Sequence, residues 1–236
     1  MSKEAREWDD IMKEISDGFN ERRRNLALKM FNDIFFFSKT GFRLNLHNEV
    51  AYAPLSPYYF SFRNTVRIPE TRKELALILK PFIENLCPKK LVDLPESITP
   101  LIATISDNTN IPIISVRSEY LRGNKKYHGI DVAINGEYKS GENVLIIDDV
   151  CSARAFTKLK AIEILKEAKL NVYWIVKVLL DREEGGKEIL KANGYTLWSL
   201  FTLRETTQWY LEAKLVTQKQ YAETIDYSES IKEIYL

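Results

Sequence analysis

Two adjacent aspartates, Asp148 and Asp149, come directly after an apolar run at residues 144–147. An apolar run bounded by turn residues predicts a strand buried on both faces, and open α/β sheets bind ligands at the carboxyl ends of their strands. A short loop of mostly small residues then enters a helix-forming segment at residues 158–165, and backbone N–H groups at a helix start suit a phosphate. The segment therefore indicates a sugar-phosphate site. Aspartates that merely end the strand and cap the helix are the alternative.

A second charged motif, Asp-Arg-Glu-Glu-Gly-Gly at residues 181–186, also follows an apolar strand. Its position predicts that it converges on the same sheet edge as Asp148. The planar fork of Arg182 suits a carboxylate or a phosphate. A surface ion pair of Arg182 with Glu183 or Glu184 is the alternative.

A long polar loop at residues 117–129 concentrates positive charge after another expected strand. Loops of this length are usually functional lids or disordered segments. A mobile basic loop beside an acidic strand end suits a polyphosphate leaving group, and a solvated surface loop is the alternative. Its basic residues and histidine are Arg117, Arg122, Lys125, Lys126 and His128. The other histidine, His47, shows no partner in the sequence and is interpreted as structural.

Strands alternate with helices through most of the chain, which predicts right-handed crossovers and a parallel sheet. A helical segment is expected at residues 3–36, where Asp17 and Gly18 leave open a break into two helices. Ser97 or Thr99 is predicted to cap the helix that begins near residue 100. The strand-like stretches are residues 42–63, 90–94, 112–116, 144–147, 171–180 and 196–201, and the further helices are residues 71–86, 100–109, 156–168, 184–193 and 204–213.

The composition limits the classes of protein that fit. The 236 residues include 34 Lys and Arg against 33 Asp and Glu, and this balance gives no global basic field for nucleic acid. Cys87 and Cys151 make neither a disulfide framework nor a zinc site, and this usage fits a reducing cytosol. The N-terminus has no apolar signal region, and no run reaches membrane-spanning length. A cytoplasmic globular protein with one main domain is expected.

These motifs, in their order and spacing, resemble those of the type I phosphoribosyltransferases, and specifically the orotate phosphoribosyltransferases, over residues 26–227. Residues 144–157 are similar to the family's signature for phosphoribosyl pyrophosphate (PRPP), and residues 179–186 are similar to its strand and turn that meet orotate. The similarity also covers a Ser-Pro-Tyr-Tyr-Phe element at 56–60, a pyrophosphate loop at 95–101, a flexible catalytic loop at 117–129 and the C-terminal helices.

The resemblance implies an α/β fold, a Rossmann-type parallel sheet flanked by helices, with a small N-terminal hood and an extra N-terminal helix. Residues 1–25 would form the helical extension, and residues 26–236 the phosphoribosyltransferase-like domain, with the hood at about residues 26–65. A homodimer is also implied, because in this family the catalytic loop reaches into the neighbouring subunit.

The implied activity is transfer of ribose 5-phosphate from PRPP to orotate, which gives orotidine 5′-monophosphate and pyrophosphate in pyrimidine biosynthesis. The transition state would be oxocarbenium-like, so positioning and charge stabilisation would be the main tasks. Mg²⁺, bound mainly through PRPP rather than by protein ligands, would partly neutralise the pyrophosphate.

The resemblance also implies which residues form the site. The implied catalytic residues are Arg117, Lys126, His128 and Asp149. The implied orotate-binding residues are Tyr59, Phe60, Ser152 and Arg182. The implied PRPP-binding residues are Glu96, Ser97, Arg117, Ser118, Lys126, His128, Asp148, Asp149, Ser152, Ala153, Arg154, Ala155 and Phe156.

Several residues depart from the family pattern. Arg154 stands where glycine usually lets the backbone approach a phosphate, and Phe156 replaces a small or hydroxyl residue. Glu96 would place a negative charge near pyrophosphate, Ser118 occupies a usual lysine position, and the Lys-Ser-Gly that normally precedes Ser-Pro is absent before Ser56. The alternative to an enzyme is therefore a catalytically impaired protein of the same fold that binds PRPP or a nucleotide as a sensor or regulator.

Overall fold

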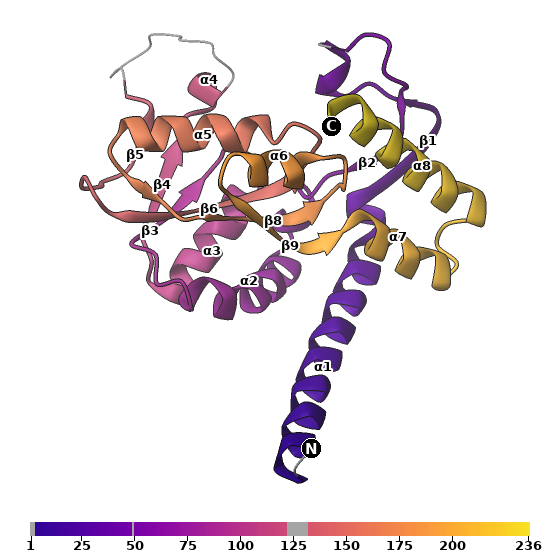
Figure 1. The fold of residues 1–236 in the computed structure, drawn as a ribbon, viewed down its shortest axis with the longest axis horizontal. Coiled ribbons are helices and arrows are strands. Elements are labelled where there is room, and N and C mark those ends of the chain that lie inside the picture. The colour runs from indigo at the N-terminus through magenta and orange to yellow at the C-terminus, as the bar shows by residue number, and fades with distance from the viewer. Residues whose placement is uncertain (1–2, 49, 122–131) are drawn as a thin grey trace.

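The computed structural model describes residues 3–48, 50–121 and 132–236, and Figure 1 shows how their elements are arranged. Within these residues a seven-stranded sheet has the order β5-β4-β3-β6-β8-β9, with β7 paired to β6. The pair of β4 and β5 is antiparallel and the other pairs are parallel. The predicted α/β fold with a mainly parallel sheet is confirmed. The strands are β3 (Lys90–Asp93), β4 (Ile113–Val116), β5 (Ile134–Asn135), β6 (Asn143–Cys151), β7 (Asn171–Val172), β8 (Ile175–Asp181) and β9 (Thr196–Thr202).

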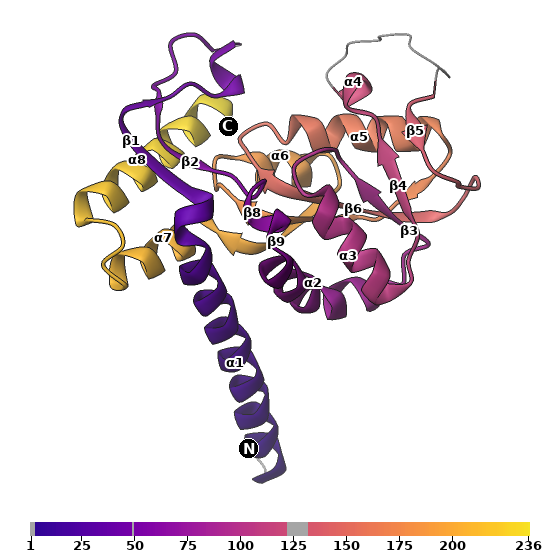
Figure 2. The same ribbon diagram turned by 180° about the vertical axis from the view of Figure 1, so that it is seen from behind.

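Helices cover both faces of the sheet. α2 (Pro69–Glu84) and α3 (Thr99–Thr109) lie on one face, and α5 (Phe156–Glu167) and α6 (Gly186–Ala192) lie on the other (Figures 1 and 2). Because both faces are covered, β6 is apolar without alternation. Its residues Leu145 and Ile147 join the buried cluster on one side, whereas Val144 and Ile146 join the cluster on the other.

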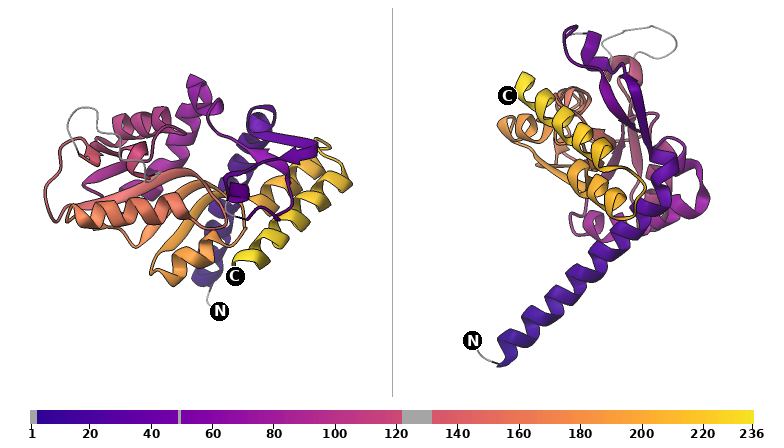
Figure 3. Two further views of the ribbon diagram at one scale, coloured as in Figure 1. Left: turned by 90° about the horizontal axis from the view of Figure 1, so that it is seen from above. Right: turned by 90° about the vertical axis from the view of Figure 1, so that its right-hand side faces the viewer.

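A separate antiparallel pair, β1 (Phe35–Phe42) and β2 (Ser56–Phe60), lies at one end of the molecule beside α8 (Gln218–Tyr235), as Figure 3 shows from above. Phe35 and Phe36 open β1, so their assignment to the first helix was wrong, and only part of the strand-like stretch at 42–63 forms a strand. The remaining elements are α4 (Ser118–Leu121), α7 (Leu203–Glu212) and the 3-10 turns η1 (Asn45–Asn48) and η2 (Thr65–Arg67). Among the described residues, no helix combines the length and apolar character needed to cross a bilayer.

α1 (Lys3–Ile34) is one continuous helix, so the break left open at Asp17 and Gly18 does not occur. A glycine inside a helix costs about 1 kcal/mol relative to alanine, and the helix-forming residues on both sides of Gly18 offset that cost. The N-terminal part of α1 projects away from the body of the molecule (Figure 3, right).

The C-terminal part of α1 is anchored in the body. Leu26 and Met30 are almost fully buried in the core. Arg23 Nε donates to Leu200 O at 2.7 Å, and the same guanidinium pairs with Glu205. These contacts tie α1 to β9 and α7.

β6 is longer than the sequence predicts. It continues through the two aspartates, with Asp148 opposite Val178 and Cys151 opposite Asp181 of β8. Pairing with β8 supplies the hydrogen bonds that extend the strand. The strand predicted at residues 171–180 is instead divided into β7 and β8.

Lys177 is a buried lysine in the middle of β8, with 3% of its surface exposed. Its Nζ lies 4.2 Å from the ring centroid of Trp198 and 5.7 Å from that of Phe82. Burial lowers the pKa of Lys177 to about 8. Near neutral pH the chain therefore keeps a charged amine in apolar surroundings, which opposes folding, and the contact with Trp198 offsets only part of that cost.

Replacing Lys177 with methionine is expected to raise the Tm at pH 7 by about 2–4 °C, the shift that ~1 kcal/mol gives in a chain of this size. The unfolded lysine keeps a pKa near ~10.4, so both states are protonated below pH ~8 and the penalty is complete there. Between pH ~8 and ~10 the folded lysine loses its proton first, and the wild type gains stability as the pH rises.

Thermal unfolding at several pH values checks this expectation, because the advantage of the methionine variant should shrink toward pH ~10. Lys219→Met is the matched control, since 81% of that side chain is exposed. An advantage of Lys177→Met that is equal at the two ends of the pH range would contradict the explanation.

Candidate functional site

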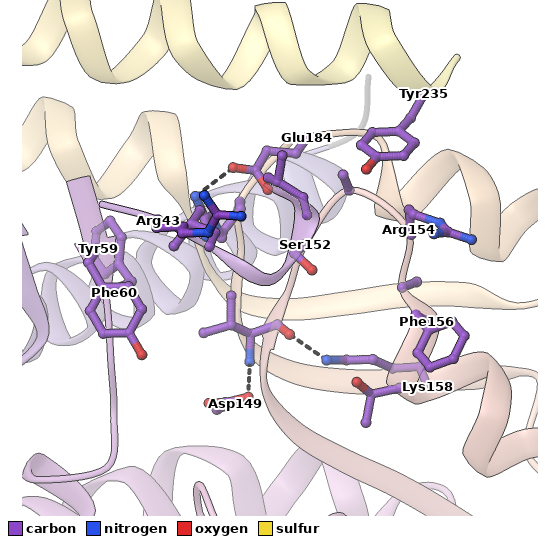
Figure 4. Close-up of a pocket in the computed structure, with 17 residues that line it drawn as sticks. Arg43, Tyr59, Phe60, Asp149, Ser152, Arg154, Phe156, Lys158, Glu184 and Tyr235 are labelled. Carbon is purple, nitrogen blue, oxygen red and sulfur yellow. Dashed lines mark hydrogen bonds and ion pairs between the residues drawn. The ribbon is translucent and has the colours of Figure 1, made fainter. Parts of the chain in front are cut away.

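A cavity of about 390 Å³ lies at the carboxyl ends of β6 and β8, facing the β1–β2 pair and the end of α8 (Figure 4). Parallel sheets bind ligands at this position. The residues that line the cavity are Arg43, Leu44, Leu46, Tyr59, Phe60, Asp149, Val150, Ser152, Ala153, Arg154, Ala155, Phe156, Thr157, Lys158, Arg182, Glu184 and Tyr235.

The cavity collects much of the predicted site. The predicted residues that line it are Tyr59, Phe60, Asp149, Ser152, Ala153, Arg154, Ala155, Phe156 and Arg182. The predicted residues that do not line it are Glu96, Ser97, Arg117, Ser118 and Asp148. Lys126 and His128 lie outside the described residues, as do Arg122 and Lys125.

Asp148 is turned into the protein rather than toward the cavity. It is 4% exposed; its Oδ2 lies 2.6 Å from Lys158 Nζ, and its Oδ1 accepts from Asp149 N at 2.9 Å. Lys158 Nζ also donates to Val150 O. Burial lowers the pKa of Lys158, but Asp148, Cys151 and Asp149 together outweigh burial, and the pKa rises to about 12. Both oxygens of Asp148 are thus engaged within the chain, and its contact with a ribose hydroxyl stays a prediction.

Asp149 is the acidic residue of β6 that lines the cavity. Its Oδ1 accepts from Val150 N at 2.7 Å. Burial, and after it repulsion from Asp148, raises the pKa of Asp149 to about 6. A carboxylate in this position can accept hydrogen bonds from hydroxyl groups or stabilise positive charge on a sugar. It carries its full charge only above that pKa.

The loop at residues 152–156 turns sharply from β6 into α5. Ala155 has a φ of +47°, a conformation that costs about 1–2 kcal/mol for a residue other than glycine. Gly186 packs so close to this loop that a Cβ there would lie 2.1 Å from Ser152 O, which explains the glycine at the first position of α6. The loop backbone stands at the start of α5, where N–H groups suit an anion.

The two bulky residues of this loop lie at the cavity rim. Figure 4 shows Arg154 between Phe156 and Tyr235 of α8, and its guanidinium carbon is 6.0 Å from each ring centroid. Phe156 is 53% exposed. Stacking of the arginine between two rings holds it at the rim, so neither side chain fills the cavity.

Arg182 is buried in a network with Glu184 and Tyr58. Its Nη2 lies 2.7 Å from Glu184 Oε1, and the same oxygen accepts the Tyr58 hydroxyl at 3.0 Å. The guanidinium carbon lies 4.8 Å from the centroid of the Tyr58 ring. Burial raises the pKa of Glu184, and Arg182 opposes that shift. The predicted alternative, a surface ion pair of Arg182 with Glu183 or Glu184, is therefore right about Glu184 as the partner. It is wrong about the surface, because both side chains are buried.

The predicted pyrophosphate-binding residues follow β3 and β4, outside the lining of the cavity. Arg117 Nη2 lies 3.3 Å from Glu119 Oε1, and its Nη1 donates to Val132 O at 3.3 Å. Glu96 is exposed and Ser97 is half-buried. Their contact with pyrophosphate stays a prediction.

Asp93, which the sequence predictions did not place in the site, ends β3 as another buried acid at this sheet edge. It is 2% exposed, and its Oδ2 accepts from Thr99 Oγ1 at 2.9 Å and from Ser115 Oγ at 3.4 Å. Burial raises the pKa of Asp93, and the two hydroxyl groups oppose the shift. α3 begins without a side-chain cap, so the predicted cap by Ser97 or Thr99 is wrong, and Thr99 serves Asp93 instead.

Four charged or aromatic lining residues were missed by the sequence predictions: Arg43, Lys158, Glu184 and Tyr235. Lys158 did leave a signal, because it shares the inner face of the predicted helix with the apolar residues Ile162 and Leu165. Arg43 and Tyr235 come from segments far from the motifs, and no local pattern marks them.

A Lys-Thr-Gly triplet at residues 39–41 lies near the end of β1. The next residue, Phe42, pairs with Ser56, and a Cβ on Gly41 would lie 2.6 Å from Leu55 Cβ. Gly41 thus lies beside Leu55, the residue directly before Ser56, although the β1–β2 connection at residues 43–55 separates the two in sequence.

Comparison with known proteins places the chain among a consistent set of relatives. No family model matches it. The orotate phosphoribosyltransferase of Pyrococcus furiosus is 30% identical over 152 residues, which cover 64% of this chain and 80% of that protein. The bifunctional enzyme PyrF/PyrE of Nostoc sp. is 29% identical over 165 residues, which cover 70% of this chain and 33% of that protein, so this chain spans about a third of it. Among solved structures, the UMP synthase of Leishmania donovani matches with a TM-score of 0.73 and 27% identity, over 87% of this chain and 42% of that one.

Proposed function

The chain belongs to the orotate phosphoribosyltransferase family, and we propose that it transfers ribose 5-phosphate from PRPP to orotate in pyrimidine biosynthesis. In this reaction the bond between C1 of the ribose and pyrophosphate breaks, and pyrophosphate leaves with the bonding electrons. A bond from C1 to a ring nitrogen of orotate forms as that nitrogen loses its proton to the solvent, and orotidine 5′-monophosphate is the product.

The composition of the cavity carries this proposal. Asp149 presents a carboxylate, the 152–156 loop presents its backbone at the start of α5, and Tyr59 and Phe60 present aromatic rings from β2. A carboxylate suits a ribosyl centre that gains positive charge, a helix start suits a 5′-phosphate, and aromatic rings suit a planar base. A volume of about 390 Å³ is typical of a small-molecule site.

The further residue roles are proposed from the family resemblance. Arg117, Lys126 and His128 would act on the pyrophosphate, and Ser152 and Arg182 would meet the base. A homodimer is proposed as well, in which the loop at residues 117–129 of one subunit reaches the other. A cytoplasmic location is proposed because free cysteines fit a reducing compartment.

Mg²⁺ is proposed as the cofactor, held mainly by the oxygens of PRPP. This ion often binds through one or two carboxylates together with substrate phosphates, and Asp149, which lines the cavity, fits such an arrangement. Bound there, the ion would neutralise negative charge on the pyrophosphate.

A protein that binds PRPP or a nucleotide without turnover is the second candidate. The ion pair of Lys158 with Asp148 favours this second candidate, because Asp148 then binds Lys158 and is not available to a ligand in the cavity. The stacked Arg154, in place of the usual glycine, also favours it.

Incubation of the purified protein with PRPP, Mg²⁺ and orotate is expected to convert orotate to orotidine 5′-monophosphate, because the cavity retains an acid, a phosphate loop and a base-binding face. Chromatography of the two compounds over time measures the conversion, and omission of Mg²⁺ should slow it. Tight PRPP binding without any conversion would reject the enzyme and favour the sensor.

A further inference from the structure

Arg43 brings to the cavity a positive charge that no carboxylate in the described part of the chain neutralises. Its side chain is exposed, and it is among the lining residues drawn in Figure 4. It donates from Nη2 to His47 O at 3.4 Å, a long hydrogen bond. Its guanidinium is therefore available to a ligand.

Two other positively charged side chains of the cavity wall form ion pairs within the chain. Arg182 pairs with Glu184 at 2.7 Å, and both side chains are buried. Lys158 pairs with Asp148 at 2.6 Å and is also buried. Arg182 and Lys158 thus each have a carboxylate partner within the chain, whereas Arg43 has none among the described residues.

The segment that carries Arg43 is held in place by His47. This histidine is 3% exposed; its Nδ1 accepts from Leu44 N at 2.8 Å, and its Nε2 donates to Pro54 O at 3.0 Å. These bonds confirm that His47 is structural. They join both ends of the β1–β2 connection and fix the backbone from which the Arg43 side chain reaches the cavity.

We propose that Arg43 determines base specificity by binding the carboxylate of an acidic pyrimidine. This inference rests on the proposed function and names the group that would recognise the charged substituent of the base. Arg43 directly follows β1, and β2 carries the rings of Tyr59 and Phe60, so all three reach the cavity from the side opposite the phosphate loop of the sheet. A guanidinium fork matches a carboxylate with two parallel hydrogen bonds.

Equilibrium binding of two nucleotides tests the proposal, because orotidine 5′-monophosphate and uridine 5′-monophosphate differ only in the carboxylate. Calorimetric titration of the wild type should show tighter binding of orotidine 5′-monophosphate. Arg43→Gln should reduce that preference by about tenfold or more, as loss of a charge-assisted pair predicts, and should leave binding of uridine 5′-monophosphate unchanged. Arg43→Lys should keep part of the preference, because it retains the charge without the fork.

Arg63→Gln is the matched control, since Arg63 is an exposed arginine in the loop after β2 and is not part of the cavity. It should keep the full preference. Arg43→Gln should melt at the wild-type temperature, because the side chain it removes is exposed.

Retention of the preference in Arg43→Gln would overturn the inference and assign the carboxylate to Arg182. Equal binding of the two nucleotides by the wild type would overturn it too, because no group would then recognise the carboxylate. A wild type that binds neither nucleotide nor PRPP would instead reject the proposed function, and the inference with it.

Discussion

Replacing Lys158 with methionine is expected to lower the free energy of unfolding by about 3–5 kcal/mol, because the buried carboxylate of Asp148 would lose its counter-charge. Asp148 is 4% exposed and Lys158 is 5% exposed, so little water reaches the Asp148 carboxylate. Val150 O would lose a hydrogen-bond donor as well. Denaturant unfolding followed by circular dichroism measures the change.

Asp148→Asn in the same chain should restore most of the lost stability, because removing both members of a buried ion pair is often nearly neutral. Lys160→Met is the matched control on the same helix. Its ion pair with Glu163, at 2.7 Å, is partly exposed and should be worth less than about 1 kcal/mol. If Lys158→Met unfolds at the same denaturant concentration as Lys160→Met, the buried pair does not stabilise the fold as argued.

Replacing Asp149 with asparagine is expected to lower kcat/KM for PRPP by about 10²–10³-fold, the effect of removing one preorganised group that stabilises transition-state charge. Asp149 lines the cavity in which the sugar would bind, and an amide keeps its shape while losing its charge. Steady-state kinetics with orotate in excess measure the change. Asp107→Asn, at an exposed position of α3, should leave the rate unaltered.

The raised pKa of Asp149 makes two pH effects expected from the same group. Wild-type turnover should fall as the pH drops through about 6, since the carboxylate is then protonated. The stability of the folded protein should change in the opposite direction. The unfolded aspartate has a pKa near ~3.9, so the folded state binds the proton more tightly between pH ~4 and the folded pKa. The free energy of unfolding therefore falls as the pH rises through that range. Asp149→Asn should therefore be more stable than the wild type at pH ~8, and the difference should disappear near pH ~4. If Asp149→Asn is inactive but no more stable than the wild type at pH ~8, the charged Asp149 carboxylate does not destabilise the folded protein, and the explanation is wrong.

The sheet could be predicted because its strands are apolar without alternation and are separated by helical segments. This pattern arises when helices cover both faces, and β6 shows it directly, with neighbouring residues buried in clusters on opposite sides. The ends of α3 and α5 could be predicted to within a residue, because the spacing of their apolar residues differs from that of the strands. Gly18 inside α1 shows the limit of a local signal, since one unfavourable residue does not outweigh a long helical segment.

The different placement of Asp148 and Asp149 follows from the length of β6. Neighbouring side chains on a strand point to opposite faces, so two aspartates within one strand cannot line the same cavity equally. The sequence predictions ended the strand before them and therefore placed both in the site. Pairing with β8 decides this question, and such pairing connects residues about 30 positions apart, which no local pattern reports.

The contribution of the β1–β2 connection could not be predicted from sequence for a related reason. Arg43 reaches the cavity because His47 joins Leu44 to Pro54 and because β1 pairs with β2. The spacing of these residues in the sequence does not differ from that in an ordinary polar loop. The residues that recognise a ligand from outside the sheet thus depend on tertiary contacts that form around them.

The buried pair of Asp148 and Lys158 also restricts how this sequence can diverge. A mutation at either position leaves a charge stranded in the interior, so each single step lowers the fitness of the fold, whereas the joint change is nearly neutral. Selection consequently acts on the two positions as one unit. A lineage that carries the pair cannot reach a site with two free carboxylates by replacing Lys158 without passing through a less stable intermediate.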